Sequence, residues 1–106
     1  MRLSIRMKES GTNMSIPGSD QVDILAELLD ERVYQDNKWG TAFDDKNTVN
    51  DWAAYTNLYI GRATTMGATK EEQRKGLLKA AAILVAALES FDRNNGFASR
   101  HYDVAA

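Results

Sequence analysis

The chain has 106 residues, of which 43% are apolar and 26% are charged, as in an ordinary single-domain globular protein. Its net charge of −2 argues against non-specific binding to nucleic acid, and the absence of cysteine excludes disulfides and thiolate metal ligands. Residues 1–13 lack the apolar stretch of a secretory signal, and no apolar run is long enough to cross a membrane. We therefore expect a cytoplasmic protein, of a bacterium or of a cell that carries viral genes, without a membrane partner.

The first helix is expected from about residue 20 to residue 36. Pro17 and Gly18 interrupt the chain before it, and Ser19 or Asp20 can cap its first turn. We therefore divide the chain into an N-terminal arm, residues 1–19, and a single helical domain, residues 20–106. One side of the helix carries apolar residues at helical spacing: Val22, Leu25, Leu28, Leu29 and Val33. The outer face is expected to carry the charged residues Asp23, Glu27, Asp30, Glu31 and Arg32.

Residues 35–47 indicate a polar connection that contains Lys38, Trp39 and Phe43. Thr48 and Asp51 then supply a capping signal, and a second helix is expected from about residue 49 to residue 66. Its main feature is a stripe of large side chains at spacings of three and four: Trp52, Tyr55, Tyr59, Arg62 and Met66.

The third helix, expected from about residue 70 to residue 93, is the centre of the predicted fold. Thr69 and Glu72 form a Thr-x-x-Glu capping box at its start. Every residue from Ala80 to Leu88 is apolar, and a helix with no polar side belongs in the middle of a bundle or of an oligomer. We therefore predict an all-α bundle of three principal helices with a short C-terminal element, completed as a homodimer or a larger homo-oligomer.

Two cations are unusual for a plain bundle. Arg62 lies within the aromatic stripe of the second helix, and Lys79 interrupts the apolar third helix, one turn after Lys75. Burying a cation without a partner is costly, so each requires an acid, a ligand or a route to solvent. Two explanations stay open: internal ion pairs, with Glu71 and Glu72 as candidate partners, or a bound anion on which the cations converge.

The segment from Glu31 to Gly40, E-R-V-Y-Q-D-N-K-W-G, resembles the E-R-x-x-Q-x-x-K-W-G signature of small phage and bacterial MazG-like proteins. These proteins belong to the all-α NTP pyrophosphatase superfamily. Their next helix opens on a tryptophan and carries a glycine, as Trp52 and Gly61 do here. A later helix is rich in alanine and valine and ends in a Leu-Glu-x-x-Asp-Arg segment, which residues 88–93 match. The resemblance covers about residue 25 to residue 93.

The resemblance also implies a metal site, and at this site the chain departs from the family pattern. Active members hold Mg²⁺ with E-E-x-x-E on one helix and E-x-x-D on the next. Matching the glycine and the alanine-rich helices places Leu58, Tyr59 and Arg62 at the first set of positions, and Gly76 and Lys79 at the second. None of these residues supplies the carboxylate oxygens that such a site uses. We therefore expect no catalytic residue, no metal ligand and no cofactor, with Mg²⁺ required only if the chain is an active hydrolase after all.

The sequence is interpreted as that of a non-catalytic binder of a nucleotide or a nucleotide-like signal, a phosphorylated small molecule. In this interpretation cations hold the phosphate and aromatic rings stack on the base. The candidate ligand-binding residues are Lys38, Trp39, Tyr55, Tyr59, Arg62, Lys75 and Lys79. Two alternatives stay open: a helical interaction protein that binds no small ligand, and an active nucleoside triphosphate pyrophosphohydrolase that uses other acids.

Overall fold

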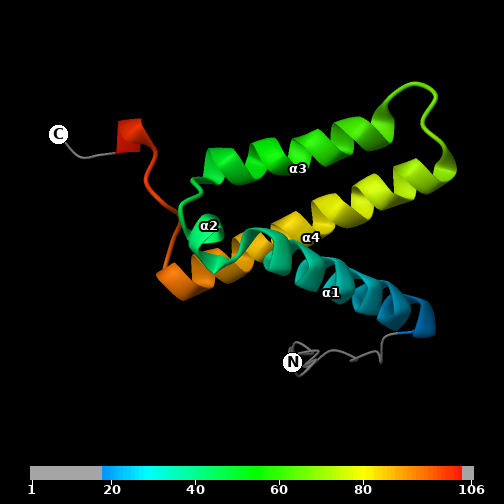
Figure 1. Ribbon diagram of the computed structural model, residues 1–106, viewed down its shortest axis with the longest axis horizontal. Helices are drawn as coiled ribbons and strands as arrows, with labels where there is room; N and C mark the ends of the chain where they lie inside the picture. The colour runs from blue at the N-terminus through cyan, green and yellow to red at the C-terminus, as the bar shows by residue number, and fades with distance from the viewer. Residues whose placement is uncertain (1–17, 104–106) are drawn as a thin grey trace, which may run out of the picture.

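The computed structural model describes residues 18–103, and the elements within this range are all helical (Figure 1). In chain order they are α1 (Ser19–Trp39), α2 (Thr41–Asp45), α3 (Val49–Thr64), α4 (Lys70–Asn94) and a final 3₁₀ turn, η1 (His101–Asp103). The predicted all-α class and the three principal helices are thereby confirmed, as is the short C-terminal element. The predicted N-terminal arm lies outside the described residues, apart from its last two positions.

Helices α3 and α4 begin where the sequence places their caps. Thr48 Oγ1 accepts a hydrogen bond from the backbone N–H of Asp51 at 3.2 Å, and Thr69 Oγ1 accepts one from that of Glu72 at 3.1 Å. In each case the acid side chain accepts a hydrogen bond from the threonine N–H in return, which completes a capping box. Backbone donors that a helix start leaves unpaired are thus satisfied locally.

The connection between α1 and α3 contains a helix that the sequence pattern does not indicate. α1 continues to Trp39, and Gly40, with φ of +84°, separates it from the single turn of α2. A helix of five residues is too short to show a periodic apolar pattern, so the sequence indicates only a polar connection there. As a result, Trp39 and Phe43 lie on two different helices, on either side of a sharp bend.

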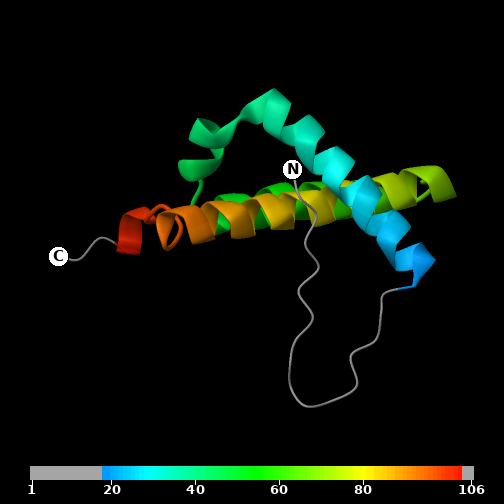
Figure 2. The ribbon, with the colours of Figure 1, turned by 90° about the horizontal axis from the view of Figure 1, so that it is seen from below.

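α3 and α4 run antiparallel side by side, and α1 crosses α4 (Figure 1). In the view turned by 90°, α1 runs obliquely across the layer that α3 and α4 form, and its C-terminal end and α2 lie on one side of this layer (Figure 2). The buried core lies along this layer and consists of Trp52 from α3 with Ile83, Ala86 and Ala87 from α4. The half-buried rings of Tyr55, Tyr59 and Phe97 pack against it.

α1 packs through part of the predicted apolar side and through charged residues beside it. Leu25, Leu28 and Leu29 are half-buried, as expected, but Val22 and Val33 are exposed. Arg32 is only 6% exposed, and Glu31 is half-buried. The prediction that Arg32 and Glu31 lie on the outer face is therefore wrong. Both side chains form ion pairs with other helices, and such pairing is what allows charged groups to leave the solvent.

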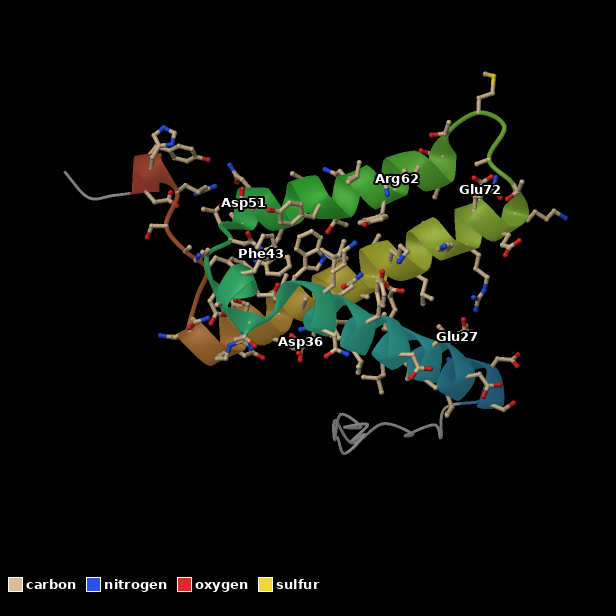
Figure 3. The ribbon with its side chains drawn as sticks, viewed as in Figure 1. Glu27, Asp36, Phe43, Asp51, Arg62 and Glu72 are labelled. Carbon is tan, nitrogen blue, oxygen red and sulfur yellow. The ribbon has the colours of Figure 1, made fainter. Side chains whose placement is uncertain are left out.

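Arg32 joins three helices. Its Nε donates a hydrogen bond to Glu89 Oε1 of α4, and its Nη2 lies 3.5 Å from Asp36 Oδ1 of α1 and 3.5 Å from Asp44 Oδ2 of α2. Figure 3 labels Asp36 and Phe43 close to this junction. The side chains of Arg32 and Asp44 are each 8% exposed, whereas those of Asp36 and Glu89 are 48% and 43% exposed. Solvent therefore screens the pairs with Asp36 and Glu89, and the buried Arg32–Asp44 pair, which links α1 to α2, is the strongest constraint of the network.

α4 is covered on only part of its circumference. Its alanine-rich side packs on the neighbouring helices, but an apolar row along the helix is exposed: Leu77, Leu84, Leu88 and Phe91, here called the α4 stripe. Leu88 alone is 63% exposed. The helices of a single chain, within residues 18–103, therefore do not enclose α4 on all sides. No helix in this range is both long and apolar enough to span a bilayer.

Gly76 marks a very close approach of α3 and α4. A Cβ placed on Gly76 would lie 2.8 Å from Ala63 Cβ and 2.8 Å from the backbone oxygen of Tyr59. A Cβ placed on Gly61, which is also inside a helix, would meet no such neighbour within 4 Å. Only the absence of a side chain at position 76 therefore lets the two helices pack at this distance.

We expect Gly76→Ala to lower the free energy of unfolding by about 1–3 kcal/mol, because the added methyl group overpacks the α3–α4 contact. Gly61→Ala is the matched control and should raise it by about 0.4–1 kcal/mol, since alanine restricts the unfolded chain and fits without a clash. Urea denaturation of the two variants measures both changes. Equal effects of the two substitutions would contradict the close approach at Gly76.

Candidate functional site

Two adjoining cavities lie along α3 and α4. The first, called the basic cavity, measures about 600 Å³ and lies where α3 passes into α4; its charged and aromatic lining residues are Tyr59, Arg62, Glu72, Lys75 and Lys79. The second, called the aromatic cavity, measures about 270 Å³ and is enclosed by residues of α1, α2, α3 and α4; its aromatic lining residues are Tyr34, Trp39, Phe43, Trp52, Tyr55 and Tyr59. Tyr59 and Lys79 line both cavities, so together they form the wall between them.

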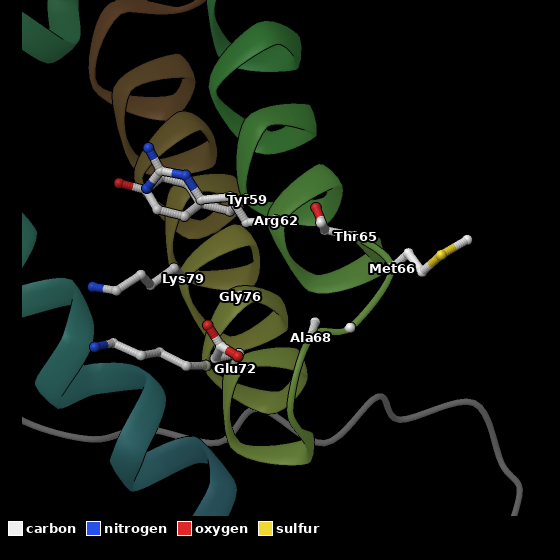
Figure 4. A pocket seen from close by; sticks show the side chains of 10 residues that line it. Tyr59, Arg62, Thr65, Met66, Ala68, Glu72, Gly76 and Lys79 are labelled. Atoms are coloured by element: carbon white, nitrogen blue, oxygen red, sulfur yellow. The ribbon is translucent and has the colours of Figure 1, made fainter.

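Arg62 gives the basic cavity an unneutralised cation. Its guanidinium Cζ lies 5.1 Å from the centroid of the Tyr59 ring, a cation–π contact that orients the group but leaves its charge in place (Figure 4). Neither Arg62 nor Lys75 has a carboxylate within ion-pair distance among residues 18–103. Both side chains are therefore available to an anion that enters the cavity.

Glu72 is the acidic residue of the basic cavity, and its carboxylate is already hydrogen-bonded to the backbone at the start of α4. Its Oε1 accepts a hydrogen bond from Thr69 N at 2.9 Å. This hydrogen bond from the Thr69 backbone lowers the pKa of Glu72 below its usual value, so the group stays ionised. Glu72 thus reduces the positive potential of the cavity, but it pairs with the helix start and leaves Arg62 and Lys75 without a partner.

Lys79 has an internal partner. Its Nζ lies 3.1 Å from Glu31 Oε2, and the side chains of the two are only 19% and 14% exposed. The same Nζ lies 5.2 Å from the centroid of Tyr34 and 6.0 Å from that of Tyr59. In Figure 4 Lys79 points from α4 toward α1. The partner is therefore on α1, and Glu71 and Glu72, the candidates from the sequence, do not hold Lys79.

The aromatic cavity passes from an exposed rim to a buried floor. Tyr34, Trp39 and Leu58 at the rim are about half exposed, at 54%, 53% and 49%. Trp52 and Asp44 at the floor are 5% and 6% exposed. Small-molecule pockets in proteins usually start at about 300 Å³, so this cavity is near the lower end of that range. It fits a small, flat and largely apolar group that enters from the rim.

Three aromatic rings are stacked along one wall of this cavity. The Trp39 and Phe43 ring centroids are 5.0 Å apart with an interplanar angle of 30°, and those of Phe43 and Tyr55 are 6.1 Å apart at 29°. Trp52 meets Tyr55 edge-on at 88°. These contacts order the rings in advance. The ring of Trp39 is half exposed, and Lys38 Nζ lies 5.1 Å from its centroid, so a planar ligand that stacks on Trp39 has to displace the Lys38 side chain or share the ring with it.

Asp44 is the buried acid of the aromatic cavity. Burial raises the pKa of its carboxyl, and the nearby positive charge of Arg32 acts in the opposite direction. On the facing wall Gln35 Nε2 donates to Glu31 Oε2 at 3.1 Å, which holds that carboxylate beside Lys79. The cavity is therefore lined by both acceptors and donors: two carboxylates, those of Glu31 and Asp44, face three cations and the indole N–H of Trp52, which is buried without a partner in the described part of the chain.

The structure brings all the predicted ligand-binding residues to these cavities. Tyr59, Arg62, Lys75 and Lys79 line the basic cavity, and Lys38, Trp39, Tyr55, Tyr59 and Lys79 line the aromatic one. Sequence reasoning missed Tyr34, Gln35 and Asp44. Gln35 could have been found from the sequence, because it belongs to the E-R-x-x-Q segment. Asp44 could not, because it lies on the short α2, which shows no sequence pattern.

A carboxylate metal centre is not formed by the residues that the structure describes: no group of three His, Cys, Asp or Glu side chains is placed to hold one ion. At position 76 a glutamate has no room, since even a Cβ would collide with α3. Leu58 lies at the rim of the aromatic cavity, Arg62 brings positive charge to the basic one, and Lys79 is paired with Glu31. The local geometry thus suits an anion better than a cation.

Comparison of the chain with family models, with curated proteins and with solved structures finds no match in any of the three. The resemblance of residues 31–40 to the MazG-like signature therefore stays a prediction from the sequence. A ligand is therefore indicated by the charge and the aromatic rings of the residues that line the two cavities.

We expect Lys79→Ala, in phosphate-free buffer and without ligand, to lower the free energy of unfolding by about 1–3 kcal/mol, because Glu31 is left half-buried without its cation. Arg62→Ala is the control from the same cavity and should change it by less than about 0.5 kcal/mol, since Arg62 is exposed. Denaturant unfolding of both variants provides the measurement. Equal stability of the Lys79 variant and the native chain would show that the ion pair with Glu31 is not formed in solution.

Proposed function

We propose that this protein binds a nucleotide, or a nucleotide-like signal, without hydrolysing it. The observation that carries the proposal is the common wall of Tyr59 and Lys79, which joins a cavity with free cations to a cavity lined by aromatic rings. A nucleotide has the matching two parts, a charged phosphate and a flat base. The MazG-like resemblance of residues 31–40 supports the same class of ligand, because Arg32, Gln35, Lys38 and Trp39 of that segment all line the aromatic cavity.

The phosphate is assigned to the basic cavity. Arg62 is held over Tyr59 at 5.1 Å and keeps its guanidinium donors free, and Lys75 adds a second cation without an internal partner in the described chain. Guanidinium groups bind phosphate oxygens through pairs of charge-assisted hydrogen bonds. Lys79 contributes less than the sequence suggests, because Glu31 already neutralises it.

The base is assigned to the aromatic cavity. Base stacking on an aromatic side chain contributes about 1–3 kcal/mol per base, and the ring of Trp39 is half exposed at the rim. The order of the stacked rings Trp39, Phe43 and Tyr55 limits the conformational entropy lost on binding.

Absence of hydrolysis follows from the residues at the positions where the resemblance implies metal ligands. Phosphoryl chemistry of this type uses Mg²⁺ to neutralise the triphosphate and to activate water. Arg62 supplies positive charge toward the phosphate, Lys79 is neutralised by Glu31, and neither side chain binds Mg²⁺ or deprotonates water. Binding is therefore expected to be independent of Mg²⁺.

In a thermal-shift series with ribonucleoside and deoxyribonucleoside triphosphates, we expect at least one nucleotide to raise the melting temperature equally with Mg²⁺ and with a chelator. Arg62→Ala should weaken this binding about tenfold or more, since a hydrogen bond to a charged group contributes about 1.5–3 kcal/mol. Lys70→Ala is the matched control, because it removes the same charge from an exposed position outside the basic cavity.

Two results would contradict the proposal of a non-catalytic binder. One is an equal loss of binding in the Arg62 and Lys70 variants, which would mean that only the net charge matters. The other is pyrophosphate release that a chelator abolishes, which would favour the alternative of an active pyrophosphohydrolase.

A second candidate function, self-association or protein interaction, is favoured by the α4 stripe. Leu77, Leu84, Leu88 and Phe91 lie on one exposed side of a helix whose other sides are packed, and exposed apolar rows of this kind commonly mark interfaces. We propose a second copy of this chain as the partner, because a stripe of identical residues on two antiparallel α4 helices is self-complementary. This proposal is compatible with nucleotide binding, since the stripe lines neither cavity.

Light scattering at high micromolar concentration should therefore give at least the mass of a dimer. The double variant Leu84→Glu, Leu88→Glu should give the monomer mass, because it places like charges in the proposed interface. Ile24→Glu is the control, an exposed apolar residue of α1 outside the stripe, and should leave the assembly intact. A native chain that stays monomeric would exclude self-association.

A further inference from the structure

The floor of the aromatic cavity carries two buried polar groups that form no hydrogen bond within residues 18–103, the carboxylate of Asp44 and the indole N–H of Trp52. The Asp44 side chain is only 8% exposed, and it lies 3.5 Å from Arg32 Nη2 as an ion pair. No hydrogen bond to this carboxylate is formed by any group in residues 18–103. Two other acids near Asp44 do have hydrogen-bond donors: Glu89 accepts a hydrogen bond from Arg32 Nε, and Glu31 accepts one from Gln35 and one from Lys79.

A buried carboxylate without hydrogen-bond donors is costly, and this one lines a cavity that a ligand can enter. It sits at the floor, beyond the aromatic rings that begin with Trp39 at the rim. A ligand that stacks on these rings therefore presents its far edge to an acceptor, the Asp44 carboxylate, and to a donor, the Trp52 indole N–H. The matching edge is one that donates hydrogen bonds to the carboxylate and carries an acceptor beside these donors.

We propose, as a refinement that rests on the proposed nucleotide binding, that the aromatic cavity selects guanine and that Asp44 reads its Watson–Crick edge. Guanine presents two adjacent N–H donors on this edge, at N1 and at the exocyclic N2, and a carboxylate accepts such a pair with both oxygens. The ion pair with Arg32 keeps the Asp44 carboxylate oriented at the junction of α1 and α2.

The other bases match an acceptor less well. Adenine and cytosine place one amino group beside an unprotonated ring nitrogen, whose lone pair faces the second carboxylate oxygen. Uracil and thymine place a single N–H between two carbonyl oxygens, and both of these repel a carboxylate. The expected order of affinity is therefore guanine first, adenine and cytosine next, and uracil and thymine last.

The direct test uses nucleosides, which carry no phosphate and so probe the aromatic cavity alone. Quenching of tryptophan fluorescence should show guanosine binding about tenfold or more tightly than inosine, which differs only by the missing N2 amino group and so loses one hydrogen bond to a charged acceptor. Adenosine and uridine should bind still more weakly than guanosine. Equal affinity of the native chain for guanosine and inosine would overturn the assignment, whatever any variant does.

Asp44→Asn gives a second, independent readout. An asparagine keeps the shape but replaces one acceptor by an N–H₂ donor, so the preference for guanosine over inosine should shrink by about tenfold. Asp36→Asn is the matched control, because Asp36 contacts the same Arg32 Nη2 at 3.5 Å but does not line the cavity. Loss of the preference in both variants would assign the effect to Arg32 and overturn the direct role of Asp44.

The outcomes separate this inference from the proposed function. Guanosine selectivity without any gain from adding the phosphate of guanosine monophosphate would support the base assignment and reject the phosphate assignment to Arg62. Binding of all nucleoside monophosphates with equal affinity would support the phosphate assignment and reject guanine selection. Tightest binding of a methylated ammonium compound such as choline would reject both, since it would identify the cavity as an aromatic cage for a cation.

Discussion

The interaction on which the rest of the structure depends is the buried ion-pair network of Arg32. One guanidinium on α1 holds Asp44 of α2 and Glu89 of α4, and it thereby fixes the bend at Gly40 against the helix layer. This bend is what places Trp39 and Phe43 in contact across two helices. A buried ion pair contributes specificity of arrangement more than net stability, and here the arrangement it specifies is the wall of the aromatic cavity.

The close packing of α3 on α4 shapes the basic cavity, which Gly76 lines. Because Gly76 allows the two backbones to approach, the position carries no side chain, and a metal-binding carboxylate cannot be accommodated without separating the helices. The same approach brings Tyr59 and Lys79 together as the wall between the cavities. At position 76, helix packing thus excludes a metal-binding carboxylate; at the other positions implied by the resemblance it is the residue type that supplies none.

Much of the fold could be predicted from local signals, and the site only in part. The capping boxes at Thr48 and Thr69 mark α3 and α4 directly, because capping is decided within one turn. The short α2 and the burial of Arg32 could not be predicted, since a five-residue helix shows no period and a charged residue is normally assigned to the surface. The pairing of Lys79 with Glu31 depends on the crossing of α1 over α4, which no local pattern encodes.

The central claim is that one ligand occupies both cavities across the wall of Tyr59 and Lys79. Titration with guanosine monophosphate, followed by proton–nitrogen NMR, tests it most directly through two side-chain signals: the indole N–H of Trp39 and the guanidinium N–H of Arg62. The account predicts that both signals shift along one binding curve with the same Kd. Shifts of only one signal, or shifts with two different Kd values, would contradict a single site that spans the two cavities.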